Sequence, residues 1–381
     1  MSGRAAIIYW CARLSHVEVR RIDPIRATIV IASRPGLAKP QRRLLARRGL
    51  MMVAHMTATA VIAGLSGCLP LIGARPLVPG ALKPGDSYHT ISVSGAARTY
   101  LLHLPPDYGR KGDKPLPIVI VLHGSGTNGS WLAQQSELND AADDHHYAVA
   151  YPDGSGTLGV EFLDWPTGDT TADGRATVLG NVHFISALIK SLARVPALDA
   201  THVFLAGVSN GGIMTYTLAC DIADKLSGFA VIAGEMPDSA CTTTRPLPVM
   251  VVHGTADEVI PYDNHGERVP GAPVSYLSAP EAVAFWAHHD GCSAPVKRSK
   301  SGHVIRELYT ECTNGTVVVF YTVVGGEHEW PGGRRSWLFG HLPTRELYAS
   351  PTMLDFFSRY GVPAERGVVN EGSEGLGRRY R

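Results

Sequence analysis

The chain has 381 residues, of which 45% are hydrophobic and 18% charged, enough apolar side chains for a full core, so disorder over most of its length is excluded. The net charge of +1 is unevenly distributed along the chain. Residues 1–68 hold 11 basic and 2 acidic side chains, whereas the rest of the chain holds 24 basic and 32 acidic side chains. An acidic body without clustered Lys and Arg excludes nucleic acid as a partner.

Residues 42–68 have the pattern of an export signal. Arg42-Arg43 and Arg47-Arg48 precede an apolar run from about Leu50 to Leu65, and Ser66-Gly67-Cys68 follows. A cysteine directly after Leu-Ser-Gly matches the lipobox of bacterial lipoproteins, in which the thiol receives a diacylglycerol and cleavage makes the cysteine the first residue. We therefore predict a lipid on Cys68 and a body that is exported, either anchored to the outer side of the cell membrane or secreted. A membrane-spanning signal anchor is the alternative, but the run is shorter than the roughly 20 apolar residues that a span requires.

The rest of the chain divides into a linker, one domain and a tail. Residues 1–49 fit a lipoprotein signal poorly, so they are expected to be disordered and without function, and the true start codon is left open. Residues 69–85 are rich in Pro and Gly and predict a flexible linker. Residues 86–362 are predicted to form a single domain, and residues 363–381, rich in Gly, Glu and Arg, a loose tail.

Within the domain, apolar runs of strand length alternate with stretches of helical period. This predicts an α/β fold with a mostly parallel sheet covered by helices on both faces, opened by an antiparallel hairpin around Ser94-Gly95. The expected strands are 88–93, 98–104, 116–122, 147–151, 203–207, 229–233, 249–252, 306–309 and 316–323, and the expected helices are 131–143, 181–192, 212–223, 280–288 and 346–360.

A candidate oxyanion-binding motif, His123-Gly124-Ser125-Gly126, directly follows the strand 116–122. In an α/β hydrolase the loop at this place supplies one backbone N–H to the oxyanion, and the residue after the nucleophile supplies the other. We assign these two donors to Ser125 and Asn210, with a simple glycine turn as the alternative at residues 123–126.

The nucleophile motif is Gly207-Val208-Ser209-Asn210-Gly211-Gly212, between an apolar strand and a helix. Glycines flank the serine because the turn from strand to helix is sharp and side chains would clash there. The turn raises the Ser209 hydroxyl above the sheet edge and points the helix N-terminus at the developing oxyanion. The motif alone is weak evidence for a catalytic serine, and its position directly after a buried strand is what supports this interpretation.

The acid and the base are predicted in two later loops, each after its own strand. Asp257 follows the strand 249–252, where catalytic groups of parallel sheets gather, with Glu258 and Asp263 as competing acids. His328 lies in a glycine-framed loop, with His303 and His341 as rivals. The order Ser209, Asp257, His328 is the order that an α/β hydrolase requires.

The substrate cleft is predicted from aromatic and apolar residues near these motifs. The loop 154–173, which contains Trp165, is expected to line the cleft together with Met214 and Trp330. An acyl chain, an aromatic acid or a sugar would suit such walls equally well.

Four cysteines in the body, an even number in an exported protein, predict two disulfides with three possible connectivities. Local pairing closes the shortest loops and is preferred, with buried thiols as the alternative. The chain has no C-x-x-C or His cluster of metal spacing, so neither a metal nor a cofactor is expected. The predicted bridges are Cys220–Cys241 and Cys292–Cys312.

From about Arg98 to Gly333 the chain resembles the esterase family of α/β hydrolases that includes poly(3-hydroxybutyrate) depolymerases and feruloyl and acetylxylan esterases. The matching segments are LHGSG, DATHVFLAGVSNGGIM, PVMVVHGTADEVIPY and GGEHEWPGG. The family's nucleophile, acid and base correspond to Ser209, Asp257 and His328, and similar members carry disulfides at the same two cysteine pairs. Two positions differ from the family pattern: Glu327 precedes the base, and Gly180-Asn181 stand where the family has Asp-Asp.

The resemblance implies a serine esterase that works through an acyl-enzyme on a small or oligomeric ester, and the lipobox predicts that a lipid holds it at the membrane. A cell-envelope acyltransferase with the same three residues is an alternative, because the acyl group could pass to an alcohol rather than to water. A non-catalytic surface lipoprotein that keeps the fold for binding is a third possibility. The physiological substrate and the oligomeric state are left open.

Overall fold

The computed structural model describes residues 74–110, 114–156, 162–167, 172–238, 241–263, 275–335 and 342–361. The predicted export signal, the lipid site Cys68 and the tail 363–381 lie outside these residues. No helix among the described residues is long and apolar enough to cross a membrane.

Eleven strands of the described part form one sheet in the order β1-β2-β3-β5-β4-β6-β7-β9-β13-β12-β11. The central strands from β5 to β13 pair in parallel, and antiparallel pairs flank them on both sides. The strands are β1 (Arg75–Pro76), β2 (Gly85–Val93), β3 (Ala96–Leu104), β4 (Leu116–Leu122), β5 (Ala148–Pro152), β6 (Leu198–Val208), β7 (Gly228–Ile232), β9 (Val249–Gly254), β11 (Lys297–Ser301), β12 (Val304–Tyr309) and β13 (Val318–Val323), with β8 (Met236–Pro237) and β10 (Tyr276–Leu277) paired separately.

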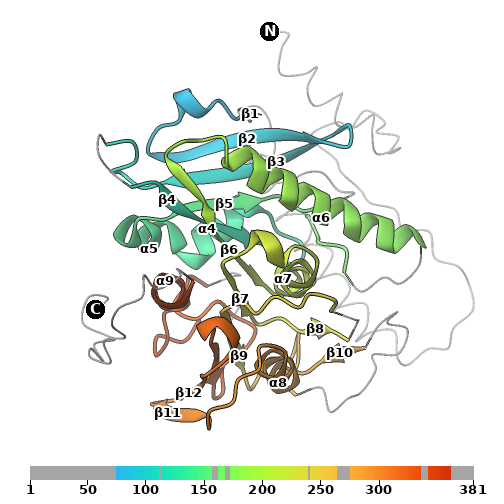
Figure 1. Cartoon of the computed structure of the whole chain (residues 1–381), viewed down its shortest axis with the longest axis vertical. Coiled ribbons are helices and arrows are strands. Elements are labelled where there is room, and N and C mark those ends of the chain that lie inside the picture. The colour runs from blue at the N-terminus through green and yellow to red at the C-terminus, as the bar shows by residue number, and fades with distance from the viewer. Residues whose placement is uncertain are drawn as a thin grey trace, which may run out of the picture. The chain divides into compact units, whose positions relative to one another are not determined.

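Helices cover both faces of this sheet, as the alternating sequence pattern predicts (Figure 1). One buried cluster joins the sheet to α6 (Ala172–Leu192), α7 (Asn210–Asp221) and α8 (Ala279–His289). A second cluster joins the opposite face to α4 (Gly129–Ser136), α5 (Leu138–His145) and α9 (Ala349–Tyr360). Apolar residues fill the central strands because both of their faces are covered. The α/β-hydrolase fold is confirmed.

Three elements differ from the sequence prediction. The single helix expected over 131–143 is two helices, α4 and α5, because Glu137 adopts a left-handed conformation (φ 51°) that ends the first. Helix α6 begins before its predicted start at Asn181. Within the expected linker, Arg75–Pro76 pairs in parallel with β2, so the sheet begins before residue 86.

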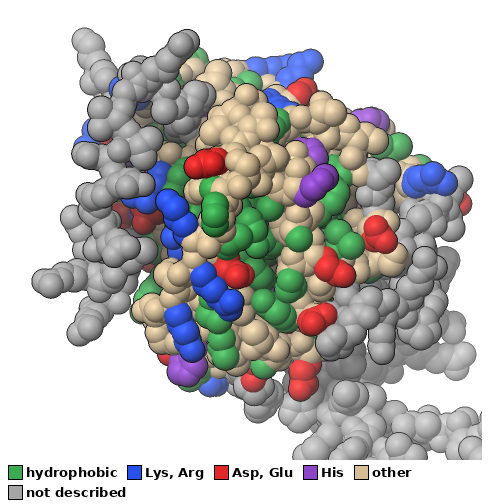
Figure 2. All heavy atoms as spheres, turned by 60° about the horizontal axis from the view of Figure 1, so that its bottom comes forward, with side chains coloured by type: hydrophobic (Ala, Val, Ile, Leu, Met, Phe, Trp, Pro, Cys, Tyr) green, Lys and Arg blue, Asp and Glu red, His purple; other side chains and the backbone are tan. Residues whose placement is uncertain are grey.

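The sequence pattern also did not predict the edge strand β11. All five of its residues are exposed, and three of them are Lys297, Arg298 and Lys300. Figure 2 views the molecule from the side of its lower end in Figure 1 and shows Lys and Arg side chains in a row along one side of that face. Charged side chains on an edge strand oppose pairing with a second molecule, which accounts for a strand without an apolar face.

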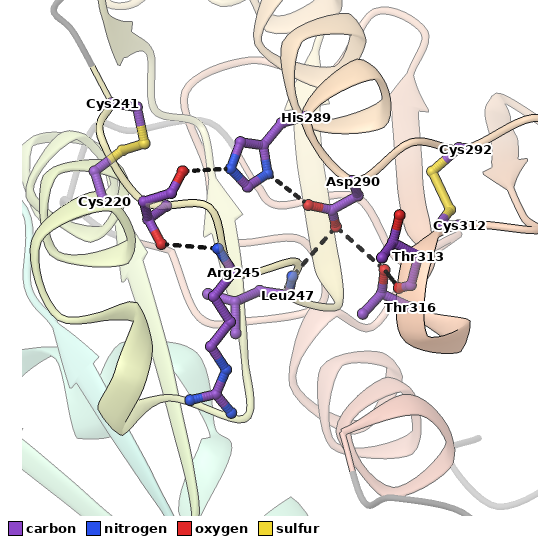
Figure 3. Close-up of polar contacts among 11 residues, drawn as sticks. Cys220, Cys241, Arg245, Leu247, His289, Asp290, Cys292, Cys312, Thr313 and Thr316 are labelled. Carbon is purple, nitrogen blue, oxygen red and sulfur yellow. Dashed lines mark hydrogen bonds and ion pairs between the residues drawn. A yellow bond between two sulfur atoms is a disulfide. The ribbon is translucent and has the colours of Figure 1, made fainter.

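Both predicted disulfides, Cys220–Cys241 and Cys292–Cys312, are present. Between them lies a buried polar cluster around Asp290, which ends α8 (Figure 3). Its carboxylate accepts hydrogen bonds from His289 Nδ1 (2.7 Å) and Leu247 N (3.3 Å), and His289 Nε2 donates to Thr243 O (2.9 Å). Asp290 O also accepts from the Thr313 amide, one residue after Cys312 (2.8 Å). The cluster therefore ties the two disulfide-bonded loops to each other and to the end of α8.

Candidate active site

Ser209 stands on a sharp turn between β6 and α7. Its backbone is strained, with φ 56° and ψ −125°, and its amide donates to Ile232 O of the neighbouring strand (3.0 Å). A Cβ on Gly207 would collide with Gly211 O, and one on Gly211 with the carbonyls of Leu122 and His123. These close backbone approaches explain the glycines of the motif and hold the serine half-exposed above the sheet edge.

The hydroxyl, imidazole and carboxylate predicted from three distant motifs form one hydrogen-bonded line. Ser209 Oγ lies 2.9 Å from His328 Nε2, and His328 Nδ1 lies 2.8 Å from Asp257 Oδ2. Because a carboxylate only accepts, Nδ1 carries the imidazole proton and Nε2 is the acceptor for the serine hydroxyl. The His328 side chain is 23% exposed and that of Asp257 is fully buried, so the base is accessible and its partner is not.

The surroundings of Asp257 keep its carboxylate ionised. Burial on its own raises the pKa of this group, but hydrogen bonds from His253 and His328, the charge of His328 and the Ile260 amide outweigh it and leave the pKa well below its usual range. The other carboxylate oxygen accepts from the amides of Val259 and Ile260, each at 2.9 Å. An ionised carboxylate at this place can orient the imidazole and stabilise its cation.

The predicted rivals lie away from this line or outside the described part. Glu258 and Asp263 are exposed. His303 Nδ1 is bonded to Glu346 (2.7 Å) on the surface, and His341 is outside the described residues.

The loop after β4, the predicted oxyanion loop, runs directly against Ser209. A Cβ on Gly124 would stand 3.3 Å from Ser209 Cβ and 3.8 Å from its hydroxyl. Asn210 is the first residue of α7, so its amide has no acceptor within the helix. The loop that holds Ser125 and the helix that begins at Asn210 therefore meet at the serine.

His123, the first residue of the predicted oxyanion motif, holds this loop in shape. Its ring is fully buried; Nδ1 donates to Gly124 O (2.8 Å) and Nε2 accepts from Gly154 N (2.9 Å). Burial lowers the pKa of His123 to about 4, so the ring stays neutral and can accept at Nε2. Thr127 Oγ1 also donates to Gly124 O (2.7 Å). A histidine followed by glycine at the end of a buried strand is the signal that could have revealed this role.

The three residues predicted to line the cleft belong to the core instead. Trp165 is 1% exposed, and its indole donates to His123 O (3.1 Å). Met214 is fully buried, and Trp330, 6% exposed, donates to Ser350 Oγ (3.0 Å). Burying a large apolar side chain lowers the free energy of the folded state strongly. These side chains are therefore buried in the core, although they lie near the catalytic motifs in the sequence.

The side chain of Asn210, whose amide is a predicted oxyanion donor, and Phe162 of the predicted cleft loop 154–173 both lie near this loop. Asn210 exchanges hydrogen bonds with the backbone of Trp165, accepting from its N–H (2.7 Å) and donating to its carbonyl (2.8 Å). Phe162 is 44% exposed, and one of its ring carbons lies 4.0 Å from where a Cβ on Gly126 would stand. Asn210 thus pins the segment 162–167 beside the oxyanion loop, where Phe162 offers an apolar surface at the site.

A second buried network braces the loop that His123 contacts. The Asp153 carboxylate accepts hydrogen bonds from Thr99 Oγ1 (2.6 Å) and Gly129 N (2.9 Å). Burial raises the pKa of this carboxyl group, and the effect outweighs the two hydrogen bonds and the charge of Arg98, which lower it. Arg98 donates to Asp153 O (3.0 Å) and to Asn181 Oδ1 (3.1 Å). Asn181, one of the two departures from the family pattern, therefore supports the strand β3 and the loop after β5.

At the carboxyl edge of a mostly parallel sheet, a serine on a strained turn contacts an imidazole that contacts a buried carboxylate. Among the described residues, no group of three or more His, Cys, Asp or Glu could hold a metal ion. The fold and this arrangement define a serine hydrolase of the α/β-hydrolase fold.

Comparison with known proteins shows which family of esterases the chain resembles. Residues 98–275 match the family model described as Esterase PHB depolymerase. The protein named "Putative esterase NocK" of Nocardia uniformis subsp. tsuyamanensis is 28% identical over 346 residues, which cover 81% of this chain and 97% of that protein. The chain is similar to the poly(3-hydroxybutyrate) depolymerase and feruloyl esterase-like family, and it is an esterase that acts on carboxylic ester bonds.

Two further relatives carry more specific names. Feruloyl esterase B of Piromyces equi is 29% identical over 238 residues, which cover 61% of this chain but only 43% of that protein. The solved structure of an acetyl xylan esterase from Aspergillus awamori superposes with a TM-score of 0.50 at 15% identity, covering 71% of this chain and 99% of that one, and it shows the shared fold.

Proposed function

We propose that this esterase works through an acyl-enzyme on Ser209, with His328 as the general base and Asp257 as the group that orients it. The observation that carries the proposal is the unbroken line from the Ser209 hydroxyl through His328 to Asp257, with contacts of 2.9 Å and 2.8 Å. His328 Nε2 takes the hydroxyl proton as the serine oxygen attacks the ester carbonyl, and then gives that proton to the leaving alcohol. Water, activated by the same imidazole, releases the acid and restores the serine.

The proposed oxyanion donors are the amides of Ser125 and Asn210. The contact of Gly124 with Ser209 and the position of Asn210 at the start of α7 support this assignment. Fixed N–H groups aimed at the developing negative charge stabilise the tetrahedral intermediate, and the N-terminus of α7 adds its partial positive charge. The neutral ring of His123 keeps the loop in place without adding a charge.

The proposed substrates are soluble or short esters of feruloyl, acetyl or 3-hydroxybutyryl type. The similarity to poly(3-hydroxybutyrate) depolymerases, a feruloyl esterase and an acetyl xylan esterase supports these acyl groups. The exposed ring of Phe162 beside Gly126 supports a substrate with an apolar or aromatic part near the oxyanion loop.

A panel of p-nitrophenyl and alkyl esters that varies acyl and alcohol parts tests the proposal. Ser209→Ala should lower turnover by about 10⁴-fold or more with an unchanged thermal transition, because the nucleophile is lost and the fold is kept. Ser293→Ala, on the loop after α8, is the matched control. Wild-type turnover in Ser209→Ala, or no covalent mark on Ser209 from a fluorophosphonate probe, would overturn the assignment. Acylated sugar in excess over free acid, with a sugar acceptor present, would favour acyl transfer.

We propose further that the protein acts outside the cytoplasm, tethered through a lipid on Cys68. The two disulfides support an oxidising compartment, since such bonds are rare in a reducing cytosol. Labelling cells with a palmitate analogue should mark the wild type and leave Cys68→Ala unmarked. Equal labelling of both proteins would refute the lipid site.

A further inference from the structure

A second imidazole, that of His253, faces the catalytic carboxylate. His253 lies at the end of β9, is 1% exposed and has no part in the line from Ser209 to Asp257. Its Nε2 lies 2.9 Å from Ile260 O and 3.4 Å from Asp257 Oδ2. A backbone carbonyl only accepts, so Nε2 carries the proton and donates it toward both oxygens.

The two imidazoles meet on the same carboxylate oxygen. Asp257 Oδ1 accepts from two backbone amides, and Oδ2 accepts from His328 Nδ1 at 2.8 Å while it faces His253 Nε2. Each donor to Oδ2 draws on the same negative charge, so a donor from His253 leaves less of it to stabilise a protonated His328.

We propose that His253 is a positioning residue that acts through Asp257: it ties the carboxylate to the loop 257–260 and restrains the basicity of His328. The inference rests on the proposed function, in which His328 must be neutral to accept the serine proton. His253 therefore helps to set the pH below which the esterase loses activity.

The groups around His253 come from several elements. Tyr262 packs edge-on against its ring, with the two ring centroids 6.0 Å apart. Glu235 follows β7, and burial raises the pKa of its carboxyl group. The charge of His253 opposes this rise in pKa, and the charge of Asp257 adds to it. Glu327 and Glu329, from the loop of the base, line a small pocket together with His253. Within the described part of the chain, His253 Nδ1 is buried without a hydrogen-bond partner. Only Nε2 of the ring therefore makes directed contacts. A substituted side chain that places a hydrogen-bond donor at the position of Nε2 should then fulfil the role of His253.

The pH dependence of kcat/KM on p-nitrophenyl acetate tests the inference. The acid limb of this profile reports the protonation of the base in the free enzyme. His253→Leu should move the limb upward by about 0.5 pH unit or more, because Asp257 then stabilises the protonated His328 more strongly. His253→Gln places an amide N–H where Nε2 stood and should keep the limb at the wild-type position. Tyr262→Phe, which removes the hydroxyl bonded to Thr322 but keeps the ring that packs on His253 and leaves the carboxylate untouched, is the structural control and should also leave the limb in place.

Two results would overturn the inference: an acid limb in His253→Leu at or below the wild-type pH, or an equal upward shift in His253→Gln. If His253→Leu does not fold, His253→Asn, whose amide is too short to reach Asp257, provides the same comparison. The His328 Nδ1 proton supplies a second readout by NMR, since its resonance should move in the variant without a donor and stay in His253→Gln. Failure of the proposed function is a separate outcome, seen as wild-type turnover in Ser209→Ala.

Discussion

At the residue scale, the geometry of the site depends on glycines at which two backbone segments lie too close together to leave room for a Cβ atom. The strained backbone of Ser209 costs on the order of 1–3 kcal/mol, and it persists because β6, β7 and α7 hold the turn from three sides. Helix α7 can start this close to the loop after β4 only because Gly211 has no Cβ to meet the carbonyls of Leu122 and His123. Strain and close packing together present the hydroxyl to His328.

Two glycine substitutions distinguish the effect of this close backbone approach from the general effect of replacing glycine by alanine in a helix. Gly211→Ala should lower the free energy of unfolding by at least about 3 kcal/mol and abolish esterase turnover, because its Cβ would collide with backbone that cannot move. Gly180→Ala, inside α6 with no atom within 4 Å of the added Cβ, should instead raise stability by about 0.5–1 kcal/mol. Urea denaturation and turnover measure both. Normal stability and turnover in Gly211→Ala would contradict the account of the turn.

How far single residues could be predicted from sequence depended on what surrounds them. Ser209, Asp257 and His328 stand in motifs that join a strand end to a tight loop, and such motifs constrain position strongly. Trp165 and Met214 had no such constraint, and the gain from burying them decided their place. His123 and His253 were two of 16 histidines, and only the carbonyls and amides around them in three dimensions reveal their roles.

At the scale of elements, local signals competed with tertiary packing. The apolar period of residues 131–143 fits one helix, and nothing in the period shows that Glu137 turns left-handed so that α4 and α5 can each pack on the sheet. The central strands were predictable because they are buried on both faces. The exposed edge strand β11 was not, because its pairing with β12 lies in the backbone and not in an apolar pattern.

One junction between elements should make stability depend on pH. His103 of β3 is buried between Asp86 of β2 (2.6 Å) and Asp143 of α5 (2.9 Å). Burial alone lowers the pKa of His103, but the hydrogen bonds and charges of the two carboxylates outweigh it, and the net pKa is raised. Its contribution to stability is therefore complete below the unfolded pKa of about 6.5 and is lost as pH rises through the higher folded value.

The difference in unfolding free energy between wild type and His103→Gln should therefore be larger at pH 5.5 than at pH 8.5. Urea denaturation at the two pH values measures it. His303→Gln, which removes the exposed pair of His303 with Glu346, should have a small effect at both, because water screens an exposed pair. A His103→Gln effect that grows with pH would show that the histidine is held neutral and would contradict the paired arrangement.

At the scale of the whole molecule, the esterase machinery lies at the central parallel strands of the sheet, and β1, the first described strand, lies at one edge. Ser209 follows β6, Asp257 follows β9 and His328 follows β13, whereas β1 and β2 are separated from β6 by β3, β5 and β4. Leu77 and Leu82, in the segment expected to be a linker, pack against the core on that side. The N-terminal segment should therefore affect stability without affecting catalysis.

Two chains that start at different residues test this separation. A chain from Leu69 should match the full-length protein in stability and kcat/KM. A chain from Asp86 loses β1, its pairing with β2 and both leucines, so its free energy of unfolding should fall by about 1–3 kcal/mol. Its kcat/KM at 25 °C should remain within about twofold, because a loss of this size still leaves most molecules folded when total stability is about 5–15 kcal/mol. A tenfold loss of kcat/KM at unchanged stability would mean that residues 69–85 take part in the site, and unchanged stability with full activity would mean that β1 contributes nothing to the sheet.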